Sequence, residues 1–174
     1  ETNEDGDSLS LRLWRHGSPF FSLSLPALSA GMARNAALAV LAACELGVSV
    51  QEISERLPQY RPSALRGRRL QGRGRTYFVD CYNANPASMK DSIDYFTDQC
   101  KGVPRLFVLG GMEELGDVGP ILHRQVASDI SIEENDSFIL MGEMASWMAE
   151  GLLEGGANEE QVMVLSNLDD ARPF

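Results

Sequence analysis

Apolar and polar residues alternate along two short segments near the start of the chain, residues 9–14 and 20–25. The sequence His-Gly-Ser-Pro between them favours a turn, so we expect the two segments to pair as a β-hairpin. From residue 33 to 46, leucine and alanine recur at the three- and four-residue spacing of one helix face, and Gly47 closes the segment. A shorter helix is expected over residues 50–57.

Beyond residue 75 the pattern changes to short, fully apolar segments that alternate with helical ones. Strands that are apolar on both faces are typical of a parallel sheet buried between helices. We therefore predict an α/β fold, a Rossmann-like domain that is preceded by the hairpin and its helices. The expected strands are TYFVDC, RLFVLG, SFILMG and QVMVL, and the expected helices begin at Ala87, near Pro120 and at Glu143.

Ligands of such domains bind at the carboxyl ends of the parallel strands. In this chain those ends are expected at residues 80–85, 110–112 and 142–143. The loops that follow the strands are therefore the first places to look for a site.

A stretch with Pro58, Pro62 and many glycines and arginines, running through Gly74, separates the two patterns and predicts a linker. Seven of the thirteen arginines lie between residues 56 and 75. Two interpretations remain open: a solvated connector kept soluble by its charges, or a segment that faces an anion such as phosphate.

Composition narrows the class of protein. A formal net charge of -10 argues against nucleic acid or an anionic membrane as partner, since both attract basic surfaces. The chain has no run of about 18 apolar residues and its start, ETNEDGDS, does not resemble a signal peptide, so we expect no membrane insertion. Cys44, Cys81 and Cys100 lack metal-type spacing, so neither a zinc site nor a disulfide framework is expected, and a reducing cytoplasm fits.

The segment DCYNANPASMK, residues 80–90, carries the most informative chemistry. A carboxylate at a strand end needs a partner, and Asp80 could accept hydrogen bonds from both hydroxyls of a ribose; it could equally cap a helix or hold a turn. Asn83 and Asn85 could bind amides or carboxylates, although Asn-x-Asn-Pro is also an ordinary loop before a helix.

The motif D-x-YNANPxSM after a strand, followed by VLGGMEELG and then Leu-His on a helix, resembles the C-terminal part of the Mur ligase family, of the MurF type. The preceding NAALAVLAA resembles the last helices of that family's central ATP-binding domain. The resemblance implies that residues 1–62 end the central domain, that 63–75 form the linker, and that 76–174 form a truncated C-terminal Rossmann-like domain.

The resemblance also implies roles for six residues, and it gives this chain no catalytic residue and no metal ligand. Those that match the nucleotide-binding positions of the family are Asn35 on the adenine side, Arg66 at the phosphate and Asp80 at the ribose. Those that match the loop facing the substrate are Tyr82, Asn83 and Asn85.

The chain departs from the family pattern at several positions. Gly31 and Met32 stand where histidine and asparagine are common, Gly111 stands where aspartate is usual, and Cys81 replaces serine or alanine. His123 matches the Leu-His of the family, but a lone histidine on a helix is more often packed or capped than catalytic.

The glycine-rich phosphate loop with its lysine is not in this sequence, whose two lysines, Lys90 and Lys101, follow no such glycines. The Lys-Gly-Ser-Arg run found near the C-terminus of the family's members is not in this sequence either. We therefore expect the C-terminal portion of a longer enzyme whose N-terminal and central domains are the partners of this chain.

By resemblance, the intact enzyme is an ATP- and Mg²⁺-dependent peptide ligase of peptidoglycan synthesis in the cytoplasm. ATP would phosphorylate the terminal carboxylate of UDP-N-acetylmuramoyl-tripeptide. The amine of D-alanyl-D-alanine would then attack the acyl phosphate, giving the extended precursor. The chain alone is expected to be inactive and to bind no cofactor tightly. The alternative is a noncatalytic Rossmann-like module that binds a nucleotide or a protein.

Overall fold

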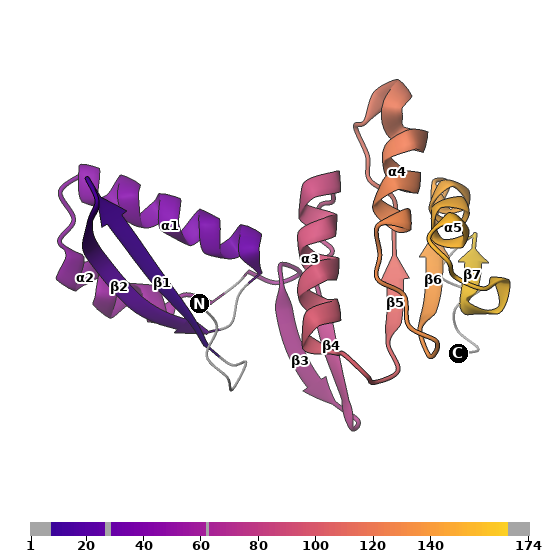
Figure 1. Ribbon diagram of the computed structural model, residues 1–174, viewed down its shortest axis with the longest axis horizontal. Coiled ribbons are helices and arrows are strands. Elements are labelled where there is room, and N and C mark those ends of the chain that lie inside the picture. The colour runs from indigo at the N-terminus through magenta and orange to yellow at the C-terminus, as the bar shows by residue number, and fades with distance from the viewer. Residues whose placement is uncertain (1–7, 27–28, 62, 167–174) are drawn as a thin grey trace. The chain divides into compact units, whose positions relative to one another are not determined.

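The computed structural model describes residues 8–26, 29–61 and 63–166, and the chain separates into two compact units, residues 1–64 and 65–174. Figure 1 labels their helices and strands. Within the described residues, no helix is both long enough and apolar enough to cross a membrane.

Unit 1, residues 1–64, is a hairpin packed with two helices. Strands β1 (Ser8–Arg15) and β2 (Ser18–Pro26) pair antiparallel, which confirms the predicted hairpin. Helix α1 (Ala30–Glu45), helix α2 (Val50–Arg56) and a 3₁₀ turn (Leu57–Gln59) follow.

Both helices of unit 1 begin at a serine. The side chain of Ser29 accepts a hydrogen bond from the Met32 amide, and that of Ser49 accepts one from the Glu52 amide. Each serine thus pairs a backbone N–H group that would otherwise lack a partner in the first turn of the helix. The small core of the unit joins the hairpin to the two helices and contains Phe21, Val40 and Ile53.

Unit 2, residues 65–174, begins with a second hairpin, β3 (Arg68–Gly72) and β4 (Arg75–Val79). It continues as helix α3 (Pro86–Gln99), strand β5 (Leu106–Leu109), a 3₁₀ turn (Gly116–Val118) and helix α4 (Gly119–Ser128). Strand β6 (Ser137–Met141), helix α5 (Ala145–Glu154), a 3₁₀ turn (Glu159–Gln161) and strand β7 (Val162–Leu165) complete it.

Strands β5, β6 and β7 form a parallel sheet in sequence order. The α/β class and the parallel sheet are therefore confirmed. Figure 1 shows α4 and α5 beside this sheet, and each lies between two consecutive strands along the chain, as in a Rossmann-like unit.

The segment TYFVDC differs from its prediction as the first parallel strand. Its residues 76–79 belong to β4 (Arg75–Val79), which pairs antiparallel with β3. Strand β3 lies within the segment 63–75 that was predicted as a linker. The reason is local: Arg73 and Gly74 both have positive φ, 50° and 73°, and join the paired residues Gly72 and Arg75 as a two-residue hairpin turn.

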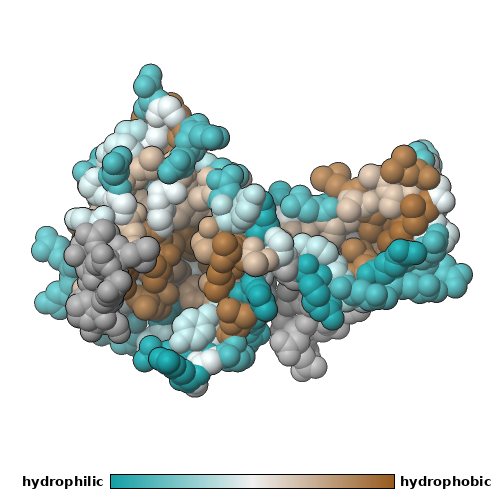
Figure 2. All heavy atoms as spheres, turned by 180° about the vertical axis from the view of Figure 1, so that it is seen from behind, coloured by the Kyte–Doolittle hydropathy of each residue, from teal (hydrophilic) through white to brown (hydrophobic). Residues whose placement is uncertain are grey.

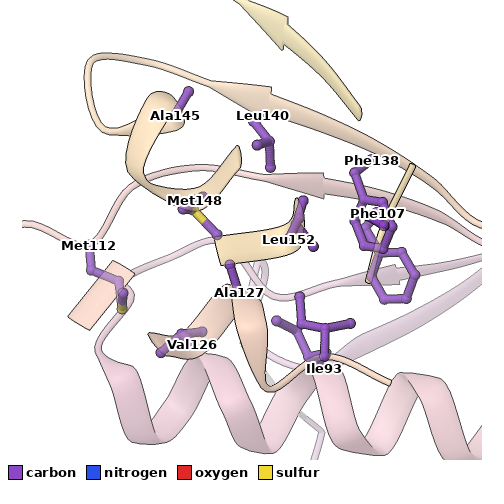
Figure 3. Packing of buried hydrophobic residues seen from close by; sticks show 12 residues of the cluster. Ile93, Phe107, Met112, Val126, Ala127, Phe138, Leu140, Ala145, Met148 and Leu152 are labelled. Atoms are coloured by element: carbon purple, nitrogen blue, oxygen red, sulfur yellow. The ribbon is translucent and has the colours of Figure 1, made fainter. Parts of the chain in front are cut away.

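An aromatic path connects the hairpin to the sheet of unit 2. The ring of Phe78 on β4 lies 6.4 Å from Phe96 on α3, Phe96 lies 5.3 Å from Phe107 on β5, and Phe107 stacks on Phe138 of β6 at 4.8 Å. Figure 3 shows Phe107 and Phe138 side by side, with Leu152 of α5 in the same core. The loop between β4 and α3 is therefore attached at both ends to packed elements.

Helices α4 and α5 approach each other through glycine. A Cβ atom on Gly151 would lie 2.2 Å from the carbonyl oxygen of Arg124, and one on Gly155 would lie 2.8 Å from that of Ser128. Only glycine fits such a close approach of two backbones.

A buried ion pair lies at the amino ends of β5 and β6. Arg105 donates to both oxygens of Asp136, from Nε at 2.8 Å and from Nη2 at 2.6 Å, and also to the Ser131 carbonyl. The hydrogen bonds to Asp136 raise the pKa of Arg105 above its ordinary value. The pair fixes the end of the sheet opposite to the ligand-binding end of such folds.

The surface of the molecule is hydrophilic over much of its area, with apolar patches between (Figure 2). Exposed apolar side chains in unit 2 include Leu106 and Val108 of β5 and Met163 of β7.

Candidate nucleotide and substrate site

Two chain segments, residues 65–67 and 80–82, are held together by backbone hydrogen bonds. The carbonyl oxygen of Leu65 accepts the amide of Cys81 at 2.9 Å and that of Tyr82 at 3.1 Å. Leu65 adopts a positive φ of 68°, which is uncommon for a residue with a branched side chain. The two segments therefore form one structural element, the 65–82 clip, defined here as residues 65–67 and 80–82.

Asp80 is a member of this clip and already has two hydrogen-bond partners. Its Oδ1 accepts the Gly67 amide at 3.2 Å, and its Oδ2 accepts the hydroxyl of Ser92 on α3. These bonds favour the loop-holding interpretation of Asp80. Because an ionised carboxylate has about four acceptor positions and the residue is exposed, hydroxyls of a ligand could still reach it.

Arg66 and Tyr82 form a cation–π contact across the clip. The guanidinium carbon of Arg66 lies 4.0 Å from the centre of the Tyr82 ring. Both residues are exposed, and within the described part of the chain no carboxylate forms an ion pair with Arg66. The Tyr82 ring thus holds the guanidinium of Arg66 in place, while the N–H groups of the guanidinium remain available for an anion.

The two asparagines of the YNANP loop accept hydrogen bonds from backbone amides of neighbouring residues. Asn85 caps α3: its Oδ1 accepts the Ser88 amide at 2.9 Å, while Ser88 Oγ accepts the Asn85 amide at 3.1 Å. The Oδ1 of Asn83 accepts the Ala84 amide at 2.9 Å. Their oxygens therefore shape the loop, and both side chains remain exposed.

The loop of residues 110–115, after β5, is anchored by the buried side chain of His123. The Nε2 of His123 accepts the Met112 amide at 2.8 Å, and its Nδ1 lies 2.7 Å from the Gly119 carbonyl, which can only accept. These contacts define the neutral ring with its proton on Nδ1. Because the imidazole is fully buried and both nitrogens are engaged, His123 supports the loop.

Gly111 lies in the same loop, where the family usually has aspartate. A Cβ atom there would lie 2.7 Å from the sulfur and 3.1 Å from the Cβ of Met144. Met144 therefore occupies the space that a side chain at position 111 would need, so the departure from the family pattern is accommodated by packing.

Five of the six predicted site residues lie in unit 2, on the clip or on the loop that follows it: Arg66, Asp80, Tyr82, Asn83 and Asn85. Asn35 belongs to unit 1, where it is exposed on α1. Leu65, Gly67 and Ser92 also contribute to this region, and the sequence did not predict them. No sequence pattern predicts a positive φ at Leu65. None predicts that the hydroxyl of Ser92 donates to a carboxylate twelve residues earlier in the chain.

Metal ligands are a different matter. The described residues hold no group of three or more His, Cys, Asp or Glu side chains that could bind a metal ion. This region therefore offers hydrogen-bonding groups and the guanidinium of Arg66 for ligand binding.

The parallel sheet, its helices and the polar loops after β4 and β5 define a Rossmann-like α/β domain of the kind that binds a ligand at one end of its strands. The chain belongs to the Mur ligase family: the family model described as Mur ligase, glutamate ligase domain, matches residues 66–173.

Similar proteins agree with this membership. The chain is 29% identical over 132 residues to the UDP-N-acetylmuramoyl-tripeptide–D-alanyl-D-alanine ligase of Bacillus subtilis, covering 75% of this chain and 29% of that protein. It is 34% identical over 121 residues to the ligase of the same name from Synechocystis, covering 69% of this chain and 26% of that protein.

Among solved structures, MurF from Acinetobacter baumannii matches with a TM-score of 0.78 and 27% identity, over 97% of this chain and 35% of that one. The chain thus spans about a third or less of the length of these relatives.

Proposed function

We propose that the protein carrying this chain is an ATP-dependent ligase that joins D-alanyl-D-alanine to UDP-N-acetylmuramoyl-tripeptide in the cytoplasm. The observation that carries the proposal is the clip with its YNANP loop. This segment lies inside the region that matches the Mur ligase family, and in it the Tyr82 ring holds the exposed guanidinium of Arg66. The names of two relatives support the choice of substrates.

In this proposal the chain is the C-terminal portion of the enzyme. Residues 1–62 end a central ATP-binding domain and residues 76–174 belong to the C-terminal domain, while the parts that the chain does not include supply the phosphate loop. The coverage of both units by a MurF structure supports this division. On its own the chain would neither perform the reaction nor bind a cofactor tightly.

The roles of individual residues follow from their chemistry. Bound ATP supplies the phosphoryl group that activates the tripeptide carboxylate. Arg66 offers planar, charged N–H donors to phosphate oxygens, and Asp80 has acceptor positions left for ribose hydroxyls. Asn35 is proposed for the adenine side, by its match to the family.

The YNANP loop is proposed to face the peptide substrates. Asn83 and Asn85 use their oxygens to shape the loop, and a side-chain amide also carries two N–H donors that can bind a carboxylate or a peptide carbonyl. Their share of the mechanism is to orient the reacting groups.

We propose no Mg²⁺ ligand in this chain. The described residues contain no group of three or more His, Cys, Asp or Glu side chains, and Mg²⁺ is commonly held by the phosphates themselves with one or two carboxylates. In the proposed enzyme, Mg²⁺ is a cofactor of the parts outside this chain.

Depletion of the full protein in its host tests the proposal. Loss of the proposed ligase should make UDP-N-acetylmuramoyl-tripeptide accumulate and its dipeptide-extended product disappear, as measured by mass spectrometry of the cytoplasmic precursors. Unchanged precursor levels would instead support a noncatalytic binding module.

A further inference from the structure

The cation–π contact within the clip pairs Tyr82 with Arg66, which its sequence position does not reveal. The match to the family assigns Tyr82 to substrate binding. In the structure its ring lies under the guanidinium of Arg66, and its backbone amide is bonded to Leu65, the residue before that arginine.

Contacts on both sides of Arg66 in the chain, and one at its side chain, hold it in place. The Leu65 carbonyl accepts two amides from the opposite segment, the Gly67 amide donates to Asp80, and the Tyr82 ring supports the guanidinium. The backbone is therefore held on both sides of Arg66, and its side chain is held at its far end. A long arginine side chain otherwise loses rotamer entropy when it binds a ligand.

We propose that Tyr82 is a positioning residue that preorganises Arg66 for an anionic ligand, and that it does not bind the peptide substrate itself. The proposal rests on the proposed function in one respect, which is that the anion is a phosphate group of ATP. An aromatic face orients a guanidinium without neutralising it, so the charge remains available for phosphate oxygens. A carboxylate in the same place would compete with the ligand.

The test uses the full protein and measures the Kd for ATP directly, separately from the KM values for the peptide substrates. Tyr82→Leu should raise the Kd for ATP about two- to fivefold, the size expected of an exposed cation–π contact. Tyr82→Phe keeps the ring and should bind ATP as the wild type does. Tyr77→Leu, which changes an exposed tyrosine of β4, is the matched control and should have no effect.

A double variant separates positioning from direct contact. If Tyr82 acts through Arg66, then Tyr82→Leu should add nothing to the weaker ATP binding of Arg66→Ala. Three results would overturn the inference: an effect of Tyr82→Leu that persists without Arg66, a raised KM for D-alanyl-D-alanine with unchanged ATP affinity, or unchanged ATP affinity in Arg66→Ala.

The two proposals can fail separately. A wild-type protein that binds ATP and performs no ligation counts against the proposed function, while its ATP affinities still decide the role of Tyr82. Because Tyr82 is 63% exposed, its replacement should leave the melting temperature unchanged, and this is checked on the same samples.

Discussion

At the scale of single residues, Asp80 combines a loop-holding role, which its hydrogen bonds show, with the ligand-binding role that we propose. It accepts hydrogen bonds from Gly67 and from Ser92, and it is also the residue that matches the ribose position of the family. The two roles predict different responses to substitution.

We predict that Asp80→Asn in the full protein raises the Kd for ATP about tenfold, because a charge-assisted pair of hydrogen bonds to the ribose is lost. Ser92→Ala is the matched control, since it removes one structural bond and leaves the carboxylate. It should lower the melting temperature slightly and keep the ATP affinity. Equal ATP affinity in Asp80→Asn and the wild type would show that Asp80 only holds the loop.

His123 makes a second prediction at this scale. His123→Phe keeps a ring of similar size and leaves the buried amide of Met112 without an acceptor, which should cost about 1–3 kcal/mol of unfolding free energy. Urea denaturation measures the loss, and hydrogen exchange at Met112 should accelerate. Gln125→Ala, exposed on the same helix, should change neither quantity; protected exchange at Met112 in the Phe variant would refute the anchoring role.

The residues of the site were predictable in part. The YNANP segment was found by its motif and lies where the sequence placed it, after a strand and before α3. The partners that hold it were not predictable, because Leu65 and Ser92 meet it through the fold and neither belongs to a recognisable pattern.

At the scale of elements, the packing of α4 against α5 depends on a glycine. Gly151→Ala would place a methyl group 2.2 Å from the Arg124 carbonyl oxygen, and the helices would have to move apart. We predict a loss of about 1–3 kcal/mol, which outweighs the gain of roughly 1 kcal/mol in helix propensity.

Thermal and chemical denaturation of the full protein measure this loss. Ser146→Ala, at an exposed position of α5, is the control and should change stability by less than about 0.5 kcal/mol. A Gly151→Ala variant as stable as the wild type would mean that the two helices are not in such close contact.

Most elements were predictable from local sequence patterns, and the pairing of β4 was not. Periodicity predicted the first hairpin, α1, α3 and the three strands of the parallel sheet, because each signal lies within one segment. The partner of β4 was missed. Its apolar residues suit a parallel strand, but pairing is decided by which segment meets it, and here a two-residue turn brings β3 first.

At the scale of the whole molecule, the division near residue 64 predicts where the chain is first cut. Chymotrypsin should cleave after Tyr60, which is 56% exposed and lies just before the boundary between the two units. Mass spectrometry of the earliest fragments identifies the site. First cleavage at Tyr95 or Phe96, within α3, would contradict the division.

At this scale we propose that the chain is the C-terminal portion of a Mur ligase that makes the dipeptide-extended precursor. The most direct measurement incubates the purified full protein with ATP, Mg²⁺, UDP-N-acetylmuramoyl-tripeptide and D-alanyl-D-alanine, and follows the product by mass spectrometry. We predict a product larger by one dipeptide, one phosphate released per product, and neither product nor phosphate from residues 1–174 alone. A full protein that forms no such product under these conditions, or an isolated chain that forms it, would contradict the account.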